Sequence, residues 1–199
     1  MADNYTQIIE NNLSALYNNL PEKLAEFLPG KQNENLFEFM AFGEKCQISP
    51  KGIMLGNEKQ TGAPGIIISL YALHAGSHAV ILKPLKAFKE FPDTMPYVGA
   101  FTSHTEQILI PHVRQIETAQ KKIIKYLQGT ETCAAESGDF SFFVTPLPKI
   151  TLCYIFYNAD EDFPPSATCL YSNNASLFLP PDALADVGEY TSKKIIELL

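Results

Sequence analysis

One short segment of the chain gathers enough carboxylates to bind a hard metal ion. Asp160-Glu161-Asp162 follow Asn158 and precede two prolines. Carboxylate oxygens are the ligands that Ca²⁺ and Mg²⁺ prefer, although the calcium-loop pattern D-x-[DN]-x-[DN]-G is absent. The competing interpretation is a solvated turn that keeps the edge of a sheet soluble. We expect the turn, and keep Asp160, Glu161 and Asp162 as candidate metal ligands.

Two histidines stand four residues apart, which is the spacing of zinc ligands on one face of a helix. In H-E-x-x-H enzymes this spacing brings both imidazoles to one ion. No glutamate follows His74, and Gly76 is expected to end a helix before His78. The helix dipole offers His74 a structural role, because a partly protonated imidazole is favourable at a helix C-terminus. His74 and His78 remain candidate ligands, with His104 or His112 added if the fold brings them close.

The four cysteines, Cys46, Cys133, Cys153 and Cys169, form no C-x-x-C pair, and we interpret them as thiols of a reducing compartment. Cys153 and Cys169 lie in apolar segments, where cysteine is usually a small core residue. Cys133 lies in a polar stretch and is expected to be the exposed thiol. No G-x-S-x-G, P-loop or G-x-G-x-x-G pattern occurs, so hydrolase, NTPase and dinucleotide-binding functions lose their usual support.

The composition is that of a folded, acidic protein. A length of 199 residues, of which 46% are hydrophobic and 19% charged, predicts one globular domain over residues 1–199. A net charge of -7 disfavours nucleic acid and anionic membrane surfaces as partners. No stretch reaches the roughly 20 apolar residues that cross a bilayer, and the first residues lack a secretory signal. We therefore expect a soluble, cytoplasmic protein.

The N-terminal part is expected to place helices around a hairpin. Apolar residues at spacings of three and four predict a helix that begins after Asp3 or Asn4 and is closed by Pro21. A helical turn follows at 24–27. Residues 36–49 predict a β-hairpin, and 53–55 a further short strand. The polar stretch 56–63 is expected to be a surface loop.

The centre of the chain combines one apolar helix with a less regular stretch. Ile66 to Leu73 are almost wholly apolar, which predicts a centrally buried helix. Val80-Ile81-Leu82 are expected to form a short strand, followed by loop and turns. Ser103-x-x-Glu106 matches a capping box and predicts a helix over 104–128. Pro111 is expected to kink this helix or to start its longer part.

The C-terminal part is expected to form an aromatic sheet closed by a helix. Strands are predicted at 140–144, 150–157 and 167–171, and the last helix begins at Pro180-Pro181. Both faces of 150–157 are apolar, which favours a covered central strand. Its aromatic side chains could line a cofactor pocket or a partner surface, but core packing is the favoured interpretation. The fold class is α+β, with mainly antiparallel sheet segments packed against N-terminal, central, 104–128 and C-terminal helices.

Several segments resemble an uncharacterised family. Phe-Pro-Pro-Ser-Ala-Thr at 163–168, Ser-Asn-Asn-Ala-Ser at 172–176 and Leu-Pro-Pro-Asp-Ala-Leu at 179–184 are similar to the C-terminal signature of the domain of unknown function 3786 family. Pro146-Leu147-Pro148 before an apolar strand keeps the same order, and 70–75 resembles the central helix of the family. The similarity is strongest over roughly 139 to 190. Around 80–97 the sequence departs from the family pattern.

The resemblance implies a setting and no catalytic residue. The family occurs mainly in anaerobic bacteria and archaea, and some members carry a cysteine-rich iron–sulfur segment in the context of corrinoid and one-carbon metabolism. This chain lacks clustered cysteines that could ligate a cluster. The resemblance therefore implies at most an iron–sulfur or corrinoid protein as partner, and no cofactor is predicted.

Two functional hypotheses follow from the sequence. The first is a non-catalytic binding or accessory protein in anaerobic cofactor or metalloprotein metabolism. The alternative is a small metal-assisted hydrolase or lyase that uses the acidic loop and a histidine. A module that oligomerises through its aromatic sheet is a third, structural possibility. We favour the first, because no residue pattern assigns a reaction.

Overall fold

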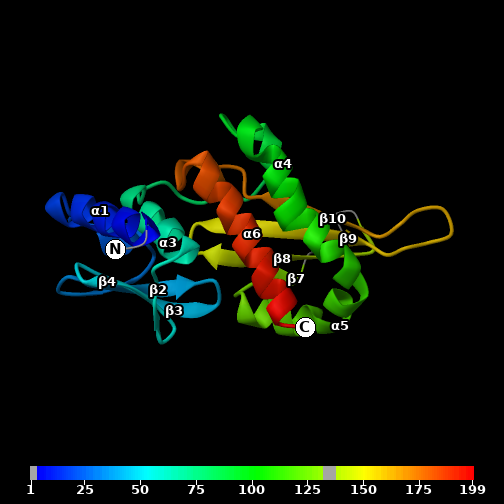
Figure 1. The fold of residues 1–199 in the computed structure, drawn as a ribbon, viewed down its shortest axis with the longest axis horizontal. Coiled ribbons are helices and arrows are strands. Elements are labelled where there is room, and N and C mark those ends of the chain that lie inside the picture. The colour runs from blue at the N-terminus through cyan, green and yellow to red at the C-terminus, as the bar shows by residue number, and fades with distance from the viewer. Residues whose placement is uncertain (1–3, 132–137) are drawn as a thin grey trace.

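The computed structural model describes residues 4–131 and 138–199, and it contains two antiparallel sheets that lie next to one another (Figure 1). The first sheet is a meander in which neighbours along the chain are neighbours in space. Its strands are β1 Lys31–Asn33, β2 Leu36–Ala41, β3 Glu44–Ser49, β4 Gly52–Leu55 and β5 Glu58–Lys59. The predicted hairpin is confirmed as β2 and β3, whereas the expected loop at 56–63 contains the short strand β5.

A tight turn sets the register of that hairpin. Ala41 pairs with Glu44, so only Phe42 and Gly43 lie between the strands. Both have positive φ, at 51° and 82°. This is the backbone twist of a two-residue hairpin turn, which glycine adopts at no steric cost. The register places Phe37, Phe39 and Ile48 in the interior.

Two helices cover the first sheet (Figure 1). The helix α1 Asn4–Asn18 buries Ile9, Leu13 and Leu16, as their spacing predicts. The helix α3 Ala63–Leu73 is apolar and central, which confirms the expectation for 66–73. The short helix α2 Leu24–Phe27 lies between α1 and the first strand.

The second sheet has the order β6-β10-β9-β8-β7. Its strands are β6 Lys86–Ala87, β7 Thr130–Glu131, β8 Phe140–Leu147, β9 Ile150–Tyr157 and β10 Ser166–Tyr171. The strand β9 lies in the centre and is buried on both faces, as predicted. The strand β8 runs three residues beyond its predicted end, because a shift in register between Val144 and Leu147 accommodates Pro146.

The helices over the second sheet differ in part from the prediction. The capping box at 103–106 is wrong: Thr102–Glu106 form a π-helical turn, η3, that continues α4 Val98–Phe101, and no side chain caps it. The 3₁₀ segment η4 Gln107–His112 follows, and α5 Val113–Tyr126 begins two residues after Pro111, which confirms that this proline starts the longer part. Further 3₁₀ turns lie at Phe88–Glu90 (η1), Met95–Tyr97 (η2) and Ala175–Leu177 (η5).

The C-terminal helix α6 Pro181–Glu197 crosses the second sheet, with η3 beside it (Figure 1). Buried apolar side chains from both sheets and from α1, α3, α5 and α6 form one cluster. The sheets also meet directly, where the backbone N–H of Phe42 donates to the carbonyl of Pro146 at 2.6 Å. Among the described residues, no helix is both long enough and apolar enough to cross a bilayer.

Candidate functional site

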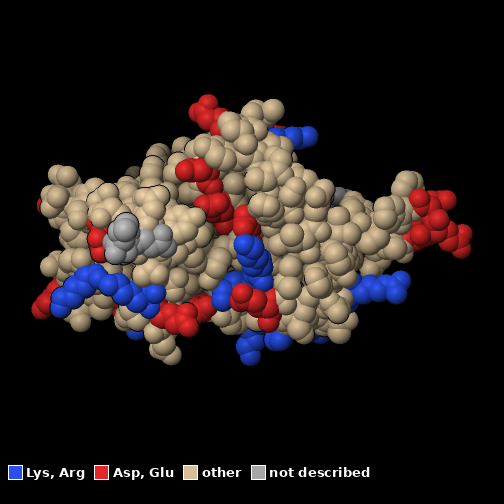
Figure 2. Space-filling view, in the orientation of Figure 1, with Lys and Arg blue, Asp and Glu red and all other residues tan. Residues whose placement is uncertain are grey.

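The acidic loop lies at one extreme of the molecule, between β9 and β10, where acidic side chains gather on the surface in Figure 2. Asp160, Glu161 and Asp162 are all exposed. The Oδ1 atom of Asp160 accepts the backbone N–H of Asp162 at 2.9 Å and that of Phe163 at 2.7 Å. This side chain therefore closes its own turn, which is a common role of aspartate in loops.

The histidines lie away from the acidic loop. His74 follows the last residue of α3, with its Nδ1 atom 2.9 Å from the carbonyl oxygen of Leu70, and His78 lies four residues further along an exposed segment. Figure 1 places α3 and the acidic loop well apart. Within 4–131 and 138–199, no three His, Cys, Asp or Glu side chains approach closely enough to hold a metal ion. The assignment of these residues as metal ligands stays a prediction.

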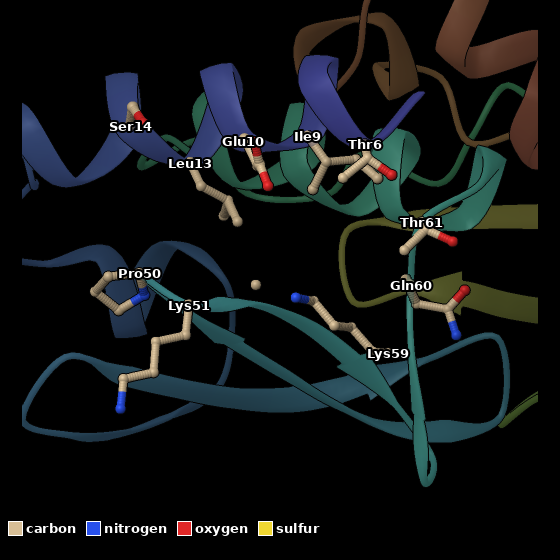
Figure 3. Close-up of a pocket in the computed structure, with 11 residues that line it drawn as sticks. Thr6, Ile9, Glu10, Leu13, Ser14, Pro50, Lys51, Lys59, Gln60 and Thr61 are labelled. Carbon is tan, nitrogen blue, oxygen red and sulfur yellow. The ribbon is translucent and has the colours of Figure 1, made fainter. Parts of the chain in front are cut away.

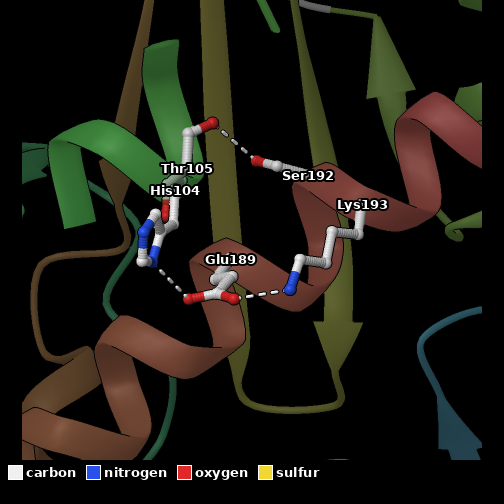
Figure 4. Close-up of polar contacts among 5 residues, drawn as sticks. All are labelled: His104, Thr105, Glu189, Ser192 and Lys193. Carbon is white, nitrogen blue, oxygen red and sulfur yellow. Dashed lines mark hydrogen bonds and ion pairs between the residues drawn. The ribbon is translucent and has the colours of Figure 1, made fainter. Parts of the chain in front are cut away.

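The other two histidines pair locally. The Nδ1 atom of His104 lies 3.0 Å from Oε2 of Glu189, and Lys193 reaches Oε1 of the same carboxylate at 2.6 Å (Figure 4). The Nδ1 atom of His112 lies 2.9 Å from the side-chain oxygen of Gln115. Among the described residues, neither His104 nor His112 forms a metal-binding group with His74 or His78.

Three cysteines belong to the interior. Cys46, Cys153 and Cys169 are buried, and burial raises the pKa of the Cys46 and Cys169 thiols. A raised pKa removes the thiolate that nucleophilic attack needs. The core role expected for Cys153 and Cys169 is confirmed, and Cys133 lies outside the described residues.

A polar cleft of about 270 Å³ lies between α1 and the end of the first sheet (Figure 3). Glu10 extends from α1 toward the cleft, and Lys59 approaches it from β5, whereas the side chain of Lys51 points away. Thr6, Gln60 and Thr61 add polar groups at the side. The cleft joins none of the residues that the sequence singled out.

The loop between α3 and β6 exposes three adjacent apolar side chains. Val80, Ile81 and Leu82 expose 39%, 53% and 37% of their surface, although all three are large and apolar. The strand predicted here is wrong, and the edge of the second sheet is formed by Lys86 and Ala87 instead. The loop after β10 bonds to this backbone instead: the side chain of Asn174 takes the N–H of Ile81 and the carbonyl of Ala79, and the N–H of Asn173 takes the carbonyl of Ile81.

Lys149 holds the start of the segment. Its ammonium group donates to the carbonyl of Gly76 at 2.6 Å and to that of His78 at 3.0 Å, and it lies 5.5 Å from the ring centre of Phe178. The residue is only 7% exposed. Burial lowers the pKa of Lys149, because removal from water disfavours the charged form. No carboxylate pairs with it among the described residues, so the two carbonyls and the aromatic ring take the place of a counter-ion.

Two asparagines of the loop after β10 bind the middle and the end of the same segment. The Oδ1 atom of Asn174 accepts the backbone N–H of Ile81 at 2.8 Å, and its Nδ2 atom donates to the carbonyl of Ala79 at 2.8 Å. The backbone N–H of Asn173 donates to the carbonyl of Ile81 at 2.8 Å, and its side chain donates to that of Pro84 at 2.9 Å. We call residues 76–84, held in this way, the clamped segment.

Comparison with known proteins decides the family. A family model described as Domain of unknown function (DUF3786) matches residues 20–194. The chain belongs to the DUF3786 family. No curated protein and no solved structure matches this DUF3786 chain.

One of the motifs that carried the resemblance to DUF3786 contacts the clamped segment, and Lys149 lies beside another. Lys149 directly follows the Pro-Leu-Pro motif at 146–148, and Asn173 and Asn174 belong to the Ser-Asn-Asn motif. The sequence indicated these motifs but no role for them. Lys149 was missed because a single lysine beside an apolar strand looks solvent-exposed. Only its burial against the loop after α3 shows otherwise.

Proposed function

We propose that this DUF3786 protein is a non-catalytic binding or accessory protein, and that the clamped segment is where a partner protein docks. The observation that carries the proposal is the exposure of Val80, Ile81 and Leu82 on a backbone fixed by buried polar side chains. Adjacent exposed apolar residues are typical of interaction sites.

The way the segment is held favours recognition. A mobile loop that docks must be ordered at that moment, and this ordering weakens the complex. Here Lys149 and Asn174 fix the backbone beforehand, so less conformational entropy remains to be lost on binding. Burial of Lys149 without a carboxylate partner is unfavourable by itself. This cost supports a role for the fixed shape of the clamped segment in binding a partner.

The partner that fits best is another protein with a complementary apolar surface. The family resemblance implies a setting of anaerobic cofactor or metalloprotein metabolism, and we propose a corrinoid or iron–sulfur protein as the partner. The chain then acts as an accessory protein and needs no catalytic residues of its own. The net charge of -7 disfavours nucleic acid as the partner.

Site-specific photo-crosslinking in an anaerobic host tests the proposal. A benzophenone amino acid at position 81 is expected to capture a protein whose absorption spectrum shows a corrinoid or an iron–sulfur cluster. The same probe at position 163 is the matched control, because Phe163 is 69% exposed but lies in the acidic loop. Equal capture at both positions, or none at position 81, contradicts the proposal.

A further inference from the structure

A second cavity lies where η1, α4 and η3 meet β10. It has a volume of about 340 Å³ and is lined by Phe88, Lys89, Phe101, Thr102, Glu106 and Thr168, among others. This volume is at the lower end of the range for small-molecule sites, about 300 to 1,000 Å³. The size suits a compact metabolite.

Glu106 is the chemically distinctive residue of this cavity. Its Oε1 atom accepts the backbone N–H of Cys169 at 3.0 Å. The ion pairs among the described residues leave its carboxylate out. A carboxylate has room for about four hydrogen bonds, so most of its accepting capacity remains available to a ligand. Burial raises the pKa of Glu106, and the nearby charge of Lys89 only partly opposes this effect.

The π-helical turn that carries Glu106 is fixed firmly to α6. The Ser192 hydroxyl donates to the carbonyl of Thr105 at 2.8 Å, and His104 contacts Glu189 from the same turn (Figure 4). Gly188 permits this close approach, since a Cβ atom there would lie 2.6 Å from the ring of Phe101 and 3.0 Å from Thr105. π-Helical turns within helices are frequent at functional sites, and this one presents its last residue to the cavity.

The walls of the cavity combine two opposite charges with an apolar surface. Glu106 is half-buried, whereas Lys89 is exposed. The rings of Phe88 and Phe101 stack at a centroid distance of 4.5 Å and, although they are only 2% and 4% exposed, they line the apolar side of the cavity. We propose that this cavity binds a zwitterion of α-amino-acid size, with its ammonium group on Glu106, its carboxylate on Lys89 and an apolar side chain along Phe88 and Phe101.

The arrangement discriminates between ligands by charge. An ammonium group offsets the cost of the half-buried carboxylate, which a neutral or anionic ligand leaves uncompensated. Lys89 repels a simple amine but attracts a carboxylate, and its flexible four-carbon stem adapts to the short separation of the two groups in an amino acid. A ligand with both charges therefore binds better than one with either charge alone.

Isothermal titration calorimetry with L-phenylalanine and two matched probes tests the inference. Phenethylamine lacks the carboxylate, and 3-phenylpropanoate lacks the ammonium group. L-Phenylalanine is expected to bind at least about tenfold more tightly than either probe, and Glu106→Gln to weaken it at least about tenfold, as the loss of one charge-assisted hydrogen bond implies. Lys89→Met should weaken phenylalanine but not phenethylamine. Glu161→Gln and Lys125→Met are controls that lie outside the cavity.

Three outcomes overturn the inference: no binding of phenylalanine up to its solubility limit, equal binding of all three probes, or binding that Glu106→Gln leaves unchanged. If a variant does not fold, the test is an NMR pH titration of the wild-type protein, in which the carboxyl ¹³C resonance of Glu106 reports its pKa. The pKa of Glu106 must fall when phenylalanine is added, because an ammonium partner favours the ionised form. An unchanged titration is a fourth outcome that overturns the inference. None of these outcomes bears on partner docking at the clamped segment.

Discussion

Replacing Asn174 by alanine should loosen the clamped segment without unfolding the protein. The side chain is 8% exposed and makes two hydrogen bonds of 2.8 Å, one with the N–H of Ile81 and one with the carbonyl of Ala79. Each bond contributes about 0.5 to 1.5 kcal/mol net, so their loss should lower the local opening free energy by about 1 to 3 kcal/mol. Every 1.4 kcal/mol corresponds to a factor of about ten. Protection of the Ile81 amide should therefore fall about fivefold to hundredfold.

Native-state hydrogen exchange measures this change residue by residue. The matched control is Asn173→Ala, which loses the single side-chain bond to Pro84 and keeps the backbone bond to Ile81. It should reduce protection at position 81 much less. Core amides of β9 should keep their protection in both variants. If Ile81 exchanges as slowly as in the wild type, or if β9 loses as much protection as Ile81, the clamp does not work as we describe.

Three further outcomes are expected. Burial raises the pKa of Glu106 above its ordinary 4.5, so just above pH 4.5 the folded state binds more protons than the unfolded state, and stability falls as pH rises through the folded-state pKa. Urea unfolding should show the wild type losing stability relative to Glu106→Gln as the pH rises above 4.5, and parallel curves would refute this. Gly129→Ala should lower the free energy of unfolding by about 1 to 3 kcal/mol or more, because its Cβ atom would lie 1.9 Å from the carbonyl oxygen of Phe143; an unchanged melting temperature would contradict the packing. A Cys133→Ala variant retains three buried cysteines and should react with a thiol reagent only after unfolding, whereas fast reaction in buffer would show that the interior opens.

Most elements were predictable because they follow from local pattern. The apolar spacing of α1, the hairpin β2–β3 and the helix start at Pro181 each depend on residues near in sequence. The errors occurred where distant residues decide. Val80-Ile81-Leu82 have strand-forming side chains, but Asn174, more than ninety residues away in the chain, accepts the N–H of Ile81 and donates to the carbonyl of Ala79. Glu106 matched a capping box, yet its carboxylate bonds to Cys169 on β10.

The candidate sites show the same division. The sequence indicated the acidic loop and the histidines, since charge and spacing are visible in one dimension, and the structure places them apart. It could not indicate Lys149 or Glu106 as site residues, because what distinguishes the buried Lys149 and the half-buried Glu106 is contact with partners that are remote in sequence.

By itself, the sequence determined the α+β class, the hairpin β2–β3, the strands β8 to β10, the central burial of β9 and membership of the DUF3786 family. Hydrophobic periodicity and turn chemistry act over a few residues, and these suffice for such features. Only the tertiary structure decided which polar groups became buried and what they hold. The free energy of a buried charge or amide depends on the partners that surround it, and at Lys149, Asn174 and Glu106 those partners come from other parts of the chain.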